Sequence, residues 1–256
     1  MQRRLREEGI RKWRAVKRAL LTQKHAKERL AWARAHQHWT VDDWKRVIWS
    51  DESAVQKDSN ATGCWVFRRQ NKREKYAPQN VRMKARDGNL SQLIWACFVG
   101  DRLGPIVFIS GSVKQDPYIE LLCMNLEPFV EALKADGETN LEFQQDNARP
   151  HTATRTRKFL EALASKHGLT IMNWPANSPD LSLIENLWAH LKHELRIQYP
   201  DTVTLKVSPE TIKAILRGRL HKIWWEIGEE VLNRLVEDMP KRVKEVIAAR
   251  GWYTSH

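Results

Sequence analysis

Three carboxylates in this 256-residue chain stand at positions where a globular protein rarely places an acid without a reason. Asp51 closes the apolar run 47–49, and Asp146 closes the run 141–145 in the same way. Both runs predict short buried strands. Because sites in open α/β sheets form at the carboxyl ends of strands, we expect these two aspartates to belong to one site.

Glu185 differs because we predict that it lies on a helix, from about Asp180 to Arg196. Leu181 comes four residues before it and Trp188 three residues after it, so the three side chains would share one face. A carboxylate on a face turned to the core must be paired, protonated or bound to a metal, since burying an isolated charge is prohibitive.

Three oxygen ligands without clustered histidine or cysteine favour Mg²⁺ or Mn²⁺ over zinc. Two such ions, about 3.5–4 Å apart, would activate a nucleophile and stabilise the leaving oxygen of an in-line phosphoryl transfer. Taken singly, each acid has the simpler interpretation of an ordinary strand-end or helix-surface carboxylate. The combination of two strand ends and one helix is what indicates a site.

Positive charge is concentrated in two segments of the chain, whose net charge is +12. Residues 1–34 hold twelve lysines and arginines against three glutamates, and residues 66–86 hold eight against one. Two basic patches on a mildly acidic body favour a polyanionic partner such as nucleic acid. Solvated charged segments without a partner are the alternative.

The order of the predicted elements indicates an α/β domain with a mixed sheet covered by helices. The longest apolar run, residues 93–99, is far shorter than the roughly 20 residues that span a bilayer, so no membrane segment is expected. Three scattered cysteines predict neither a disulfide framework nor a zinc site. The predicted elements are a helical stretch over 1–37 that restarts at Thr22, strands at 47–49, 64–67, 93–99 and 105–109, a helix over 118–133, a strand at 141–145, a helix over 152–166, a strand at 169–174, and helices over 180–196 and 209–249.

Three sequence motifs surround the acids: WSDES at 49–53, QQDNARPH at 144–151 and WPANSPDLSLIENLW at 174–188. With these motifs the chain strongly resembles the mariner superfamily of cut-and-paste DNA transposases, in its Tc-one-like branch. The resemblance implies a ribonuclease-H-like fold and a catalytic Asp-Asp-Glu triad at Asp51, Asp146 and Glu185. It also implies two Mg²⁺ or Mn²⁺ ions, double-stranded DNA of transposon ends and target as substrate, a homodimer on that DNA, and nuclear localisation.

The chain departs from the family pattern in two places near the triad. The gap of 38 residues between Asp146 and Glu185 is slightly long, and Ser182 with Leu183 replaces the usual Asn-Pro. Because proline would preset the first helical turn, we expect Asp180 or Ser178 to cap the helix instead.

The resemblance also divides the chain. Family members carry two helix-turn-helix modules ahead of the catalytic region, and only the end of the second is expected here, as a helical remnant over 1–22. A linker helix over 23–44 and a catalytic domain over 45–256 follow, with a basic insertion at about 54–88. Sequence-specific recognition of transposon ends would then be reduced, whereas contacts to DNA phosphates would remain.

Other residues are expected to support the triad or to bind DNA. His151 would stand beside the metal ligands, with a surface or structural histidine as the alternative. Asn147 would orient the turn after its strand, and Trp65 could touch DNA. The tryptophans 49, 95, 174 and 188 are expected in the core. DNA phosphates would be contacted by basic side chains, namely Arg3, Arg4, Arg6, Arg11, Lys12, Arg14, Lys17, Arg18, Arg68, Arg69, Lys72 and Arg73.

The sequence therefore predicts a metal-dependent DNA transposase domain that cuts one strand with water and then joins the freed 3′-hydroxyl to target DNA. Two other interpretations stay open. One is a catalytically silent or domesticated DNA-binding protein derived from a transposase, and the other is a nuclease of ribonuclease-H or resolvase type.

Overall fold

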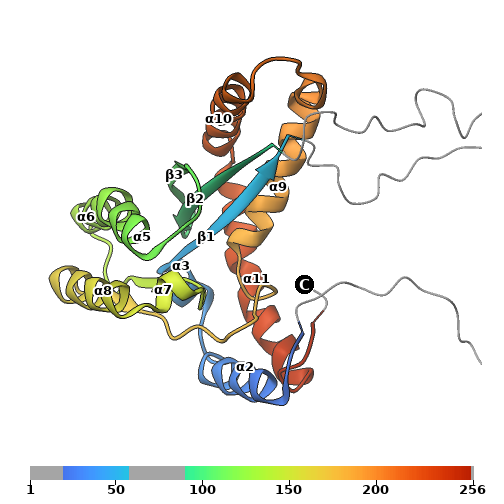
Figure 1. Ribbon diagram of the computed structural model, residues 1–256. Coiled ribbons are helices and arrows are strands. Elements are labelled where there is room, and N and C mark those ends of the chain that lie inside the picture. Colours follow the sequence, from blue (N-terminus) through green and yellow to red (C-terminus); the bar gives the residue numbers. More distant parts are fainter. Residues whose placement is uncertain (1–19, 58–89, 255–256) are drawn as a thin grey trace, which may run out of the picture.

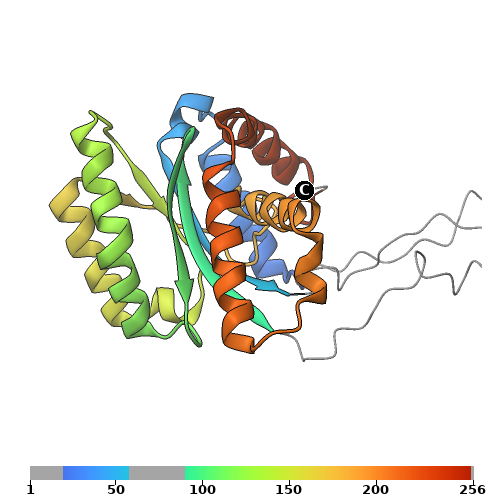
Figure 2. The same ribbon diagram turned by 90° about the horizontal axis from the view of Figure 1, so that it is seen from above.

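The computed structural model describes residues 20–57 and 90–254, which form a mixed sheet between two layers of helices (Figures 1 and 2). The strand order is β3-β2-β1-β4-β5. In this sheet β1 runs antiparallel to β2 and parallel to β4, and this confirms the predicted α/β fold with a mixed sheet. The strands are β1 (Val47–Gln56), β2 (Ser91–Val99), β3 (Arg102–Ile109), β4 (Glu142–Gln144) and β5 (Thr170–Ile171).

Each face of the sheet carries its own group of helices, as the view from above shows (Figure 2). One group comprises α5 (Gln115–Leu121), a π-helical turn (Leu122–Leu126), α6 (Glu127–Ala135), α7 (Arg149–Thr152) and α8 (Thr154–His167). The other comprises α2 (Gln23–Ala35), α3 (Val41–Lys45), α9 (Ile184–Gln198), a 3₁₀ turn (Pro200–Thr204), α10 (Pro209–Trp225) and α11 (Glu229–Ala248).

Alternation along β1 divides the apolar side chains between two cores. Trp49 and Val55 belong to the core under α9, α10 and α11, whereas Ile48 belongs to the core under α5, α6 and α8. The four tryptophans that were predicted to lie in the core are all buried. Two of them, Trp174 and Trp188, lie beside the candidate site described below. The sheet is therefore covered on both faces, and β1 is a rigid central strand.

Two local predictions are confirmed by backbone geometry. Strands β2 and β3 pair as an antiparallel hairpin, and Gly100 has the positive φ of 55° that such a tight turn requires. Helix α2 begins after Thr22, whose side chain accepts a hydrogen bond from the His25 N–H in a capping box. The capping box therefore fixes the residue at which α2 begins.

Strand β1 does not end at Asp51, so the prediction of a strand closing there is wrong. It continues to Gln56 because β2 goes on pairing with it as far as Gln56 and Ser91. Pairing with β4, in contrast, stops at Trp49 and Gln144. Asp51 therefore lies in the middle of its strand but just beyond the end of the parallel pair.

Helix α9 begins at Ile184, four residues later than predicted, and no side chain caps it. The predicted caps are wrong for a physical reason, because both candidate side chains are engaged elsewhere. Asp180 is paired with Arg29, and the Ser178 hydroxyl donates to the Ala176 carbonyl.

Several predictions concern residues that the structure does not describe. The helix over 1–19, the strand at 64–67, Trp65 and most of the basic insertion lie outside the described residues. Residues 54–56, predicted as the start of that insertion, belong to β1 instead. Within residues 20–57 and 90–254, no helix combines the length and apolar character that crossing a membrane requires.

Candidate active site

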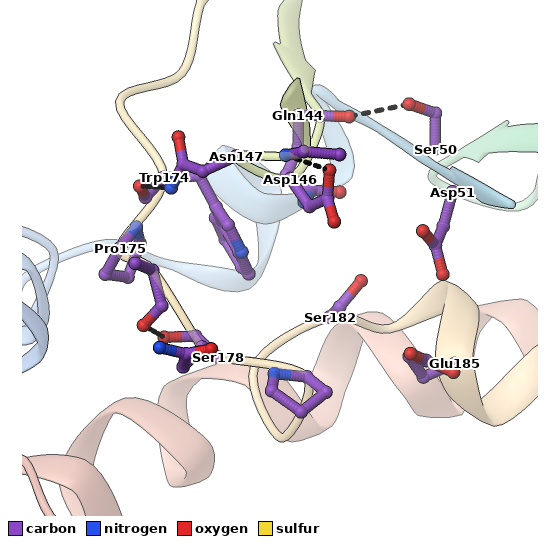
Figure 3. Close-up of a pocket in the computed structure, with 14 residues that line it drawn as sticks. Ser50, Asp51, Gln144, Asp146, Asn147, Trp174, Pro175, Ser178, Ser182 and Glu185 are labelled. Atoms are coloured by element: carbon purple, nitrogen blue, oxygen red, sulfur yellow. Dashed lines mark hydrogen bonds between the residues drawn. The ribbon is translucent and has the colours of Figure 1, made fainter. Parts of the chain in front are cut away.

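The three predicted carboxylates line one pocket of about 410 Å³. Figure 3 shows Asp51, Asp146 and Glu185 around the same open space, with Ser182 between them. They come from three elements: the middle of β1, the turn after β4 and the first turn of α9. The rest of the wall consists of Ser50, Gln144, Asn147, Ala148 and residues 174–179.

Strand register brings the two aspartates to the same end of the parallel pair. Trp49 and Gln144 are the last partners of β1 and β4, and Asp51 and Asp146 each follow two residues later. The Ser50 hydroxyl donates to the Gln144 carbonyl at 2.8 Å and so closes the gap where the strands separate. The aspartates are therefore placed by backbone pairing.

Asp51 sits in a crowded, negatively charged environment. Burial raises its pKa to about 8, and the charges of Glu185, Glu52 and Asp146 add to this effect. The Trp188 indole N–H donates to Asp51 Oδ2 at 3.3 Å. A cation bound beside this carboxyl would favour its ionised form.

Asp146 is held firmly through one oxygen. Its Oδ1 accepts from the Ala148 N–H at 2.8 Å and lies 2.6 Å from Nδ1 of His151. Burial opposes ionisation, but these two hydrogen bonds outweigh it and hold the pKa of Asp146 below its usual range. Among the described residues, Oδ2 has no hydrogen-bond partner, so this oxygen is available to a ligand.

His151 links Asp146 to a fourth carboxylate that sequence reasoning missed. Its Nε2 lies 3.2 Å from Oε1 of Glu52, and its ring stacks on Tyr118 at 4.1 Å. Burial lowers the pKa of His151, but its bonds to the two acids raise it to about 9, so both ring nitrogens donate. Glu52 follows Asp51 on β1 and faces the opposite side; strand alternation was the signal that could have found it.

Glu185 lies in the first turn of α9, where it is exposed and lines the pocket. The prediction of a core-facing position beside Leu181 is wrong, because Leu181 precedes the helix. The buried stripe consists instead of Ile184, Leu187, Trp188, Leu191 and Leu195. Desolvation by surrounding atoms still raises the pKa of Glu185, and Lys192 partly offsets this.

Lys192 is a second residue missed from the sequence. It lies two turns after Glu185 on α9, and its Nζ donates to the Ser53 hydroxyl of β1 at 2.7 Å. Burial lowers its pKa, while the charges of Glu185 and Asp51 oppose that change. Lys192 therefore provides positive charge between the helix and the strand, and its helical spacing from Glu185 was the available signal.

Asn147 connects the two sides of the pocket. Its Nδ2 donates to the Trp174 carbonyl at 2.8 Å, which joins the turn after β4 to the loop that leads toward α9. This hydrogen bond therefore holds the loop that begins at Trp174 at a fixed distance from the end of β4.

The donor set of this pocket fits a divalent oxygen-seeking cation. Two of its three carboxylates, Asp51 and Glu185, have raised pKa values, and a cation would relieve the repulsion that contributes to them. A second cluster, Glu127, Glu131 and His167, has oxygen and nitrogen atoms within 4.8 Å of one another. Lys166 already neutralises that cluster, since its Nζ lies 2.7 Å from Glu127. The pocket is therefore the better metal site.

The predicted DNA contacts cannot be placed in the same way. All twelve basic residues expected to touch phosphates lie within 1–19 and 58–89, outside the described residues.

Comparisons with known proteins identify the family of this chain. A family profile described as DDE superfamily endonuclease matches residues 46–206, and a helix-turn-helix profile described as transposase matches residues 1–38. The Tc1 transposase of Caenorhabditis elegans is 29% identical, and the Tcb1 transposase of Caenorhabditis briggsae is 30% identical. Each alignment covers all of this chain and 87% of the relative.

Solved structures show the same fold. The Mos1 mariner paired-end complex with Mn has a TM-score of 0.72 at 20% identity, covering 99% of this chain and 71% of that chain. The catalytic domain of Mos1 mariner transposase has a TM-score of 0.65 at 16% identity, covering 94% of this chain and 100% of that chain. The predicted ribonuclease-H-like architecture is thereby confirmed.

Proposed function

Because this chain belongs to the DDE superfamily of endonucleases, in its Tc1/mariner branch of DNA transposases, we propose that Asp51, Asp146 and Glu185 are its catalytic carboxylates. The observation that carries this proposal is their convergence on one pocket, in which burial and mutual repulsion raise the pKa of Asp51 to about 8. A divalent cation bound there would relieve the repulsion between the acids and take the place of the proton.

The three carboxylates would hold two Mg²⁺ or Mn²⁺ ions. When bound, the ions supply the Lewis acidity that activates water and neutralises charge on the scissile phosphate. The Mos1 structures solved with Mn and with Mg support this choice of metal. The count of two ions follows from the chemistry of in-line transfer, in which the attacking and leaving oxygens are stabilised separately.

The residues of the chain position the reacting groups and form no covalent intermediate. His151 and Glu52 orient Asp146, so that its Oδ2 faces a ligand. Lys192 offsets the negative charge of Glu185 and Asp51 before the cations bind. Cleavage releases a 3′-hydroxyl at the transposon end, and the same site then joins that hydroxyl to target DNA.

The partner is double-stranded DNA, and we propose that the chain acts on it as a homodimer in the nucleus. Relatives solved as paired-end complexes support the dimer, because two transposon ends must be cut together. Residues 1–22 and the basic insertion would contact phosphates, and residues 45–256 would carry the chemistry. Residues 23–44 would act as linker, although they form two helices, α2 and α3, where one was predicted.

A nicking assay on supercoiled plasmid tests the proposal. The full chain is compared with Glu185→Ala in Mg²⁺ and in Mn²⁺, with salt-dependent DNA retention as the binding control. We expect metal-dependent nicking by the native chain and none by the variant, with equal DNA retention. Equal nicking by both would refute the assignment of Glu185, and retention without nicking by either would favour a silent DNA-binding protein.

A further inference from the structure

Arg29 is one of the most deeply buried charged residues of the described chain. It projects from α2, is 1% exposed, and donates to both oxygens of Asp180, at 2.7 and 2.6 Å. Its Nε donates to the Gly251 carbonyl at 2.9 Å. A guanidinium that binds a carboxylate through both nitrogens has little freedom, because its planar fork sets the direction of each bond.

The partner of Arg29 does not itself line the pocket but lies in the loop that forms one of its walls. Asp180 lies between Pro179 and Ser182, and both of these line the pocket that contains Glu185. Figure 3 shows this loop running directly into the start of α9. A shift of Asp180 is therefore transmitted along four residues of chain to Glu185.

Helix α9 offers no local means of fixing that start. Its N-cap, Leu183, has no side-chain hydrogen bond to the exposed N–H groups of the first turn. A second arginine supplies a tertiary substitute, since Arg242 of α11 donates to the Asp180 carbonyl at 3.0 Å and to Asn186 Oδ1 at 2.9 Å. The two arginines thus hold the chain on both sides of Glu185.

The C-terminal segment completes this arrangement around Asp180. The Thr254 hydroxyl donates to Asp180 Oδ2 at 2.7 Å, and the Leu21 N–H donates to the Tyr253 hydroxyl at 2.9 Å. Gly251 has a φ of +82°, and a Cβ there would lie 1.9 Å from the Ala26 carbonyl oxygen. Helix α2 and the C-terminal segment therefore pack as one unit (Figure 1).

We propose that Arg29 is a positioning residue that acts through Asp180 on Glu185. Helix α2 lies inside residues 1–38, the segment that the helix-turn-helix profile matches, so the orientation of that segment would be transmitted to the metal site by this ion pair. The inference rests on the proposed role of Glu185 as a metal ligand. It adds a coupling between the DNA-binding part of the chain and its catalytic pocket.

Mn²⁺ affinity tests the proposal without depending on catalysis. The dissociation constant is measured on the full chain from the electron paramagnetic resonance signal of free Mn²⁺, for the native chain and for Arg29→Lys. We expect Arg29→Lys to weaken binding about tenfold or more, as is usual when a residue that supports a metal ligand is lost. The matched control is Arg219→Lys, which alters an Arg–Asp pair of 2.7 Å with Asp201, outside the pocket, and should leave the constant unchanged.

A double-mutant cycle separates positioning from simple structural support. In a Glu185→Gln background, Arg29→Lys should cause no further loss of Mn²⁺ affinity, because its only route to the metal is gone. Equal losses in both backgrounds, or native affinity in Arg29→Lys, would overturn the proposal. If Arg29→Lys does not fold, Thr254→Val carries the same cycle with a smaller expected loss, of about two- to fivefold.

Nicking by the same proteins distinguishes this inference from the proposed function. Arg29→Lys should require a higher Mg²⁺ concentration for half-maximal nicking, whereas a smaller folded fraction would lower the maximal rate alone. Native-like nicking by Glu185→Gln would instead refute the catalytic role of Glu185, whatever Arg29 does.

Discussion

The two sides of the proposed catalytic pocket are built by different means. Asp51 and Asp146 stand on the sheet, where the last β1–β4 pair and bonds to nearby residues set their positions. Glu185 stands on a helix without a side-chain cap, behind a loop that Arg29 and Arg242 hold from distant parts of the chain. The sheet side is fixed mainly by backbone pairing of strands, and the helix side by side-chain contacts from α2 and α11.

This difference indicates which side of the site can change its geometry. A central strand such as β1, which pairs with a neighbour on each side, has one geometry, because a shift of register by one residue would move every side chain to the wrong face. A loop held by ion pairs can take a second position at moderate cost in free energy. We therefore expect the carboxylates themselves to be required for activity and the contacts that hold the loop to set the metal affinity.

The largest effect is expected on the sheet side. Asp51→Asn and Asp146→Asn should each lower metal-dependent nicking by about a thousandfold or more, since each removes several kcal/mol of metal binding and charge stabilisation. DNA retention at fixed salt should remain native. Residual nicking within about tenfold of the native rate would show that the sheet side is not the core of the site.

A smaller effect on nicking is expected for Glu52, which acts on Asp146 through His151. Glu52→Gln should lower nicking by about 10- to 100-fold, because His151 would lose the acid that holds its Nε2 and Asp146 would turn more freely. Glu142→Gln is the matched control, since Glu142 is a half-buried acid on β4 outside this pocket. Equal losses in the two variants would assign the effect to the stability of the sheet.

The hydrogen bond of Asn147, which links the two sides of the pocket, should contribute less to the nicking rate. Asn147→Ala removes the 2.8 Å hydrogen bond to the Trp174 carbonyl and should slow nicking by about fivefold, the equivalent of about 1 kcal/mol. Asn125→Ala removes a comparable bond to the Leu121 carbonyl, away from the pocket, and should leave the rate unchanged. A native rate in Asn147→Ala would mean that the two sides are placed independently.

The smallest effect concerns the stability of the fold at low pH, to which Asp180 of the loop contributes. Burial raises the pKa of Asp180, but Arg29 and Thr254 outweigh it and hold the pKa below its usual range. Ionised Asp180 therefore stabilises the fold above the unfolded pKa near 3.9, and this contribution is lost as the pH falls through the lower folded pKa. Thr254→Val should move the acid-unfolding midpoint to higher pH and cost about 1 kcal/mol or less at neutral pH.

Circular dichroism against pH measures this shift. Thr204→Val, which removes an exposed bond to the Asp201 carbonyl, serves as the control. A midpoint that stays in place, or moves to lower pH, would contradict the assigned role of Thr254.

The same difference explains what could be predicted from the sequence. Asp51 and Asp146 follow apolar runs that any strand pattern reveals, and their proximity follows from parallel pairing. That β1 continues past Asp51 could not be seen, because it depends on where β2 pairs. The start of α9 was misplaced because Arg29, 151 positions away, engages the side chain that would otherwise cap it. Glu52 was missed because its partner, His151, is 99 positions away.

The contacts that hold α2 have a consequence for how the chain folds. Arg29 bonds Asp180 and Gly251 across 151 and 222 positions, and Leu21 bonds Tyr253 across 232 positions. Closing such long loops costs entropy before any contact is gained, so these bonds form late. During synthesis β1 and β4 can pair as soon as β4 emerges, but α2 cannot complete its contacts until α11 and the residues around Gly251 have been made. The nascent protein therefore holds its two strand-borne aspartates in place before it has a complete cutting site.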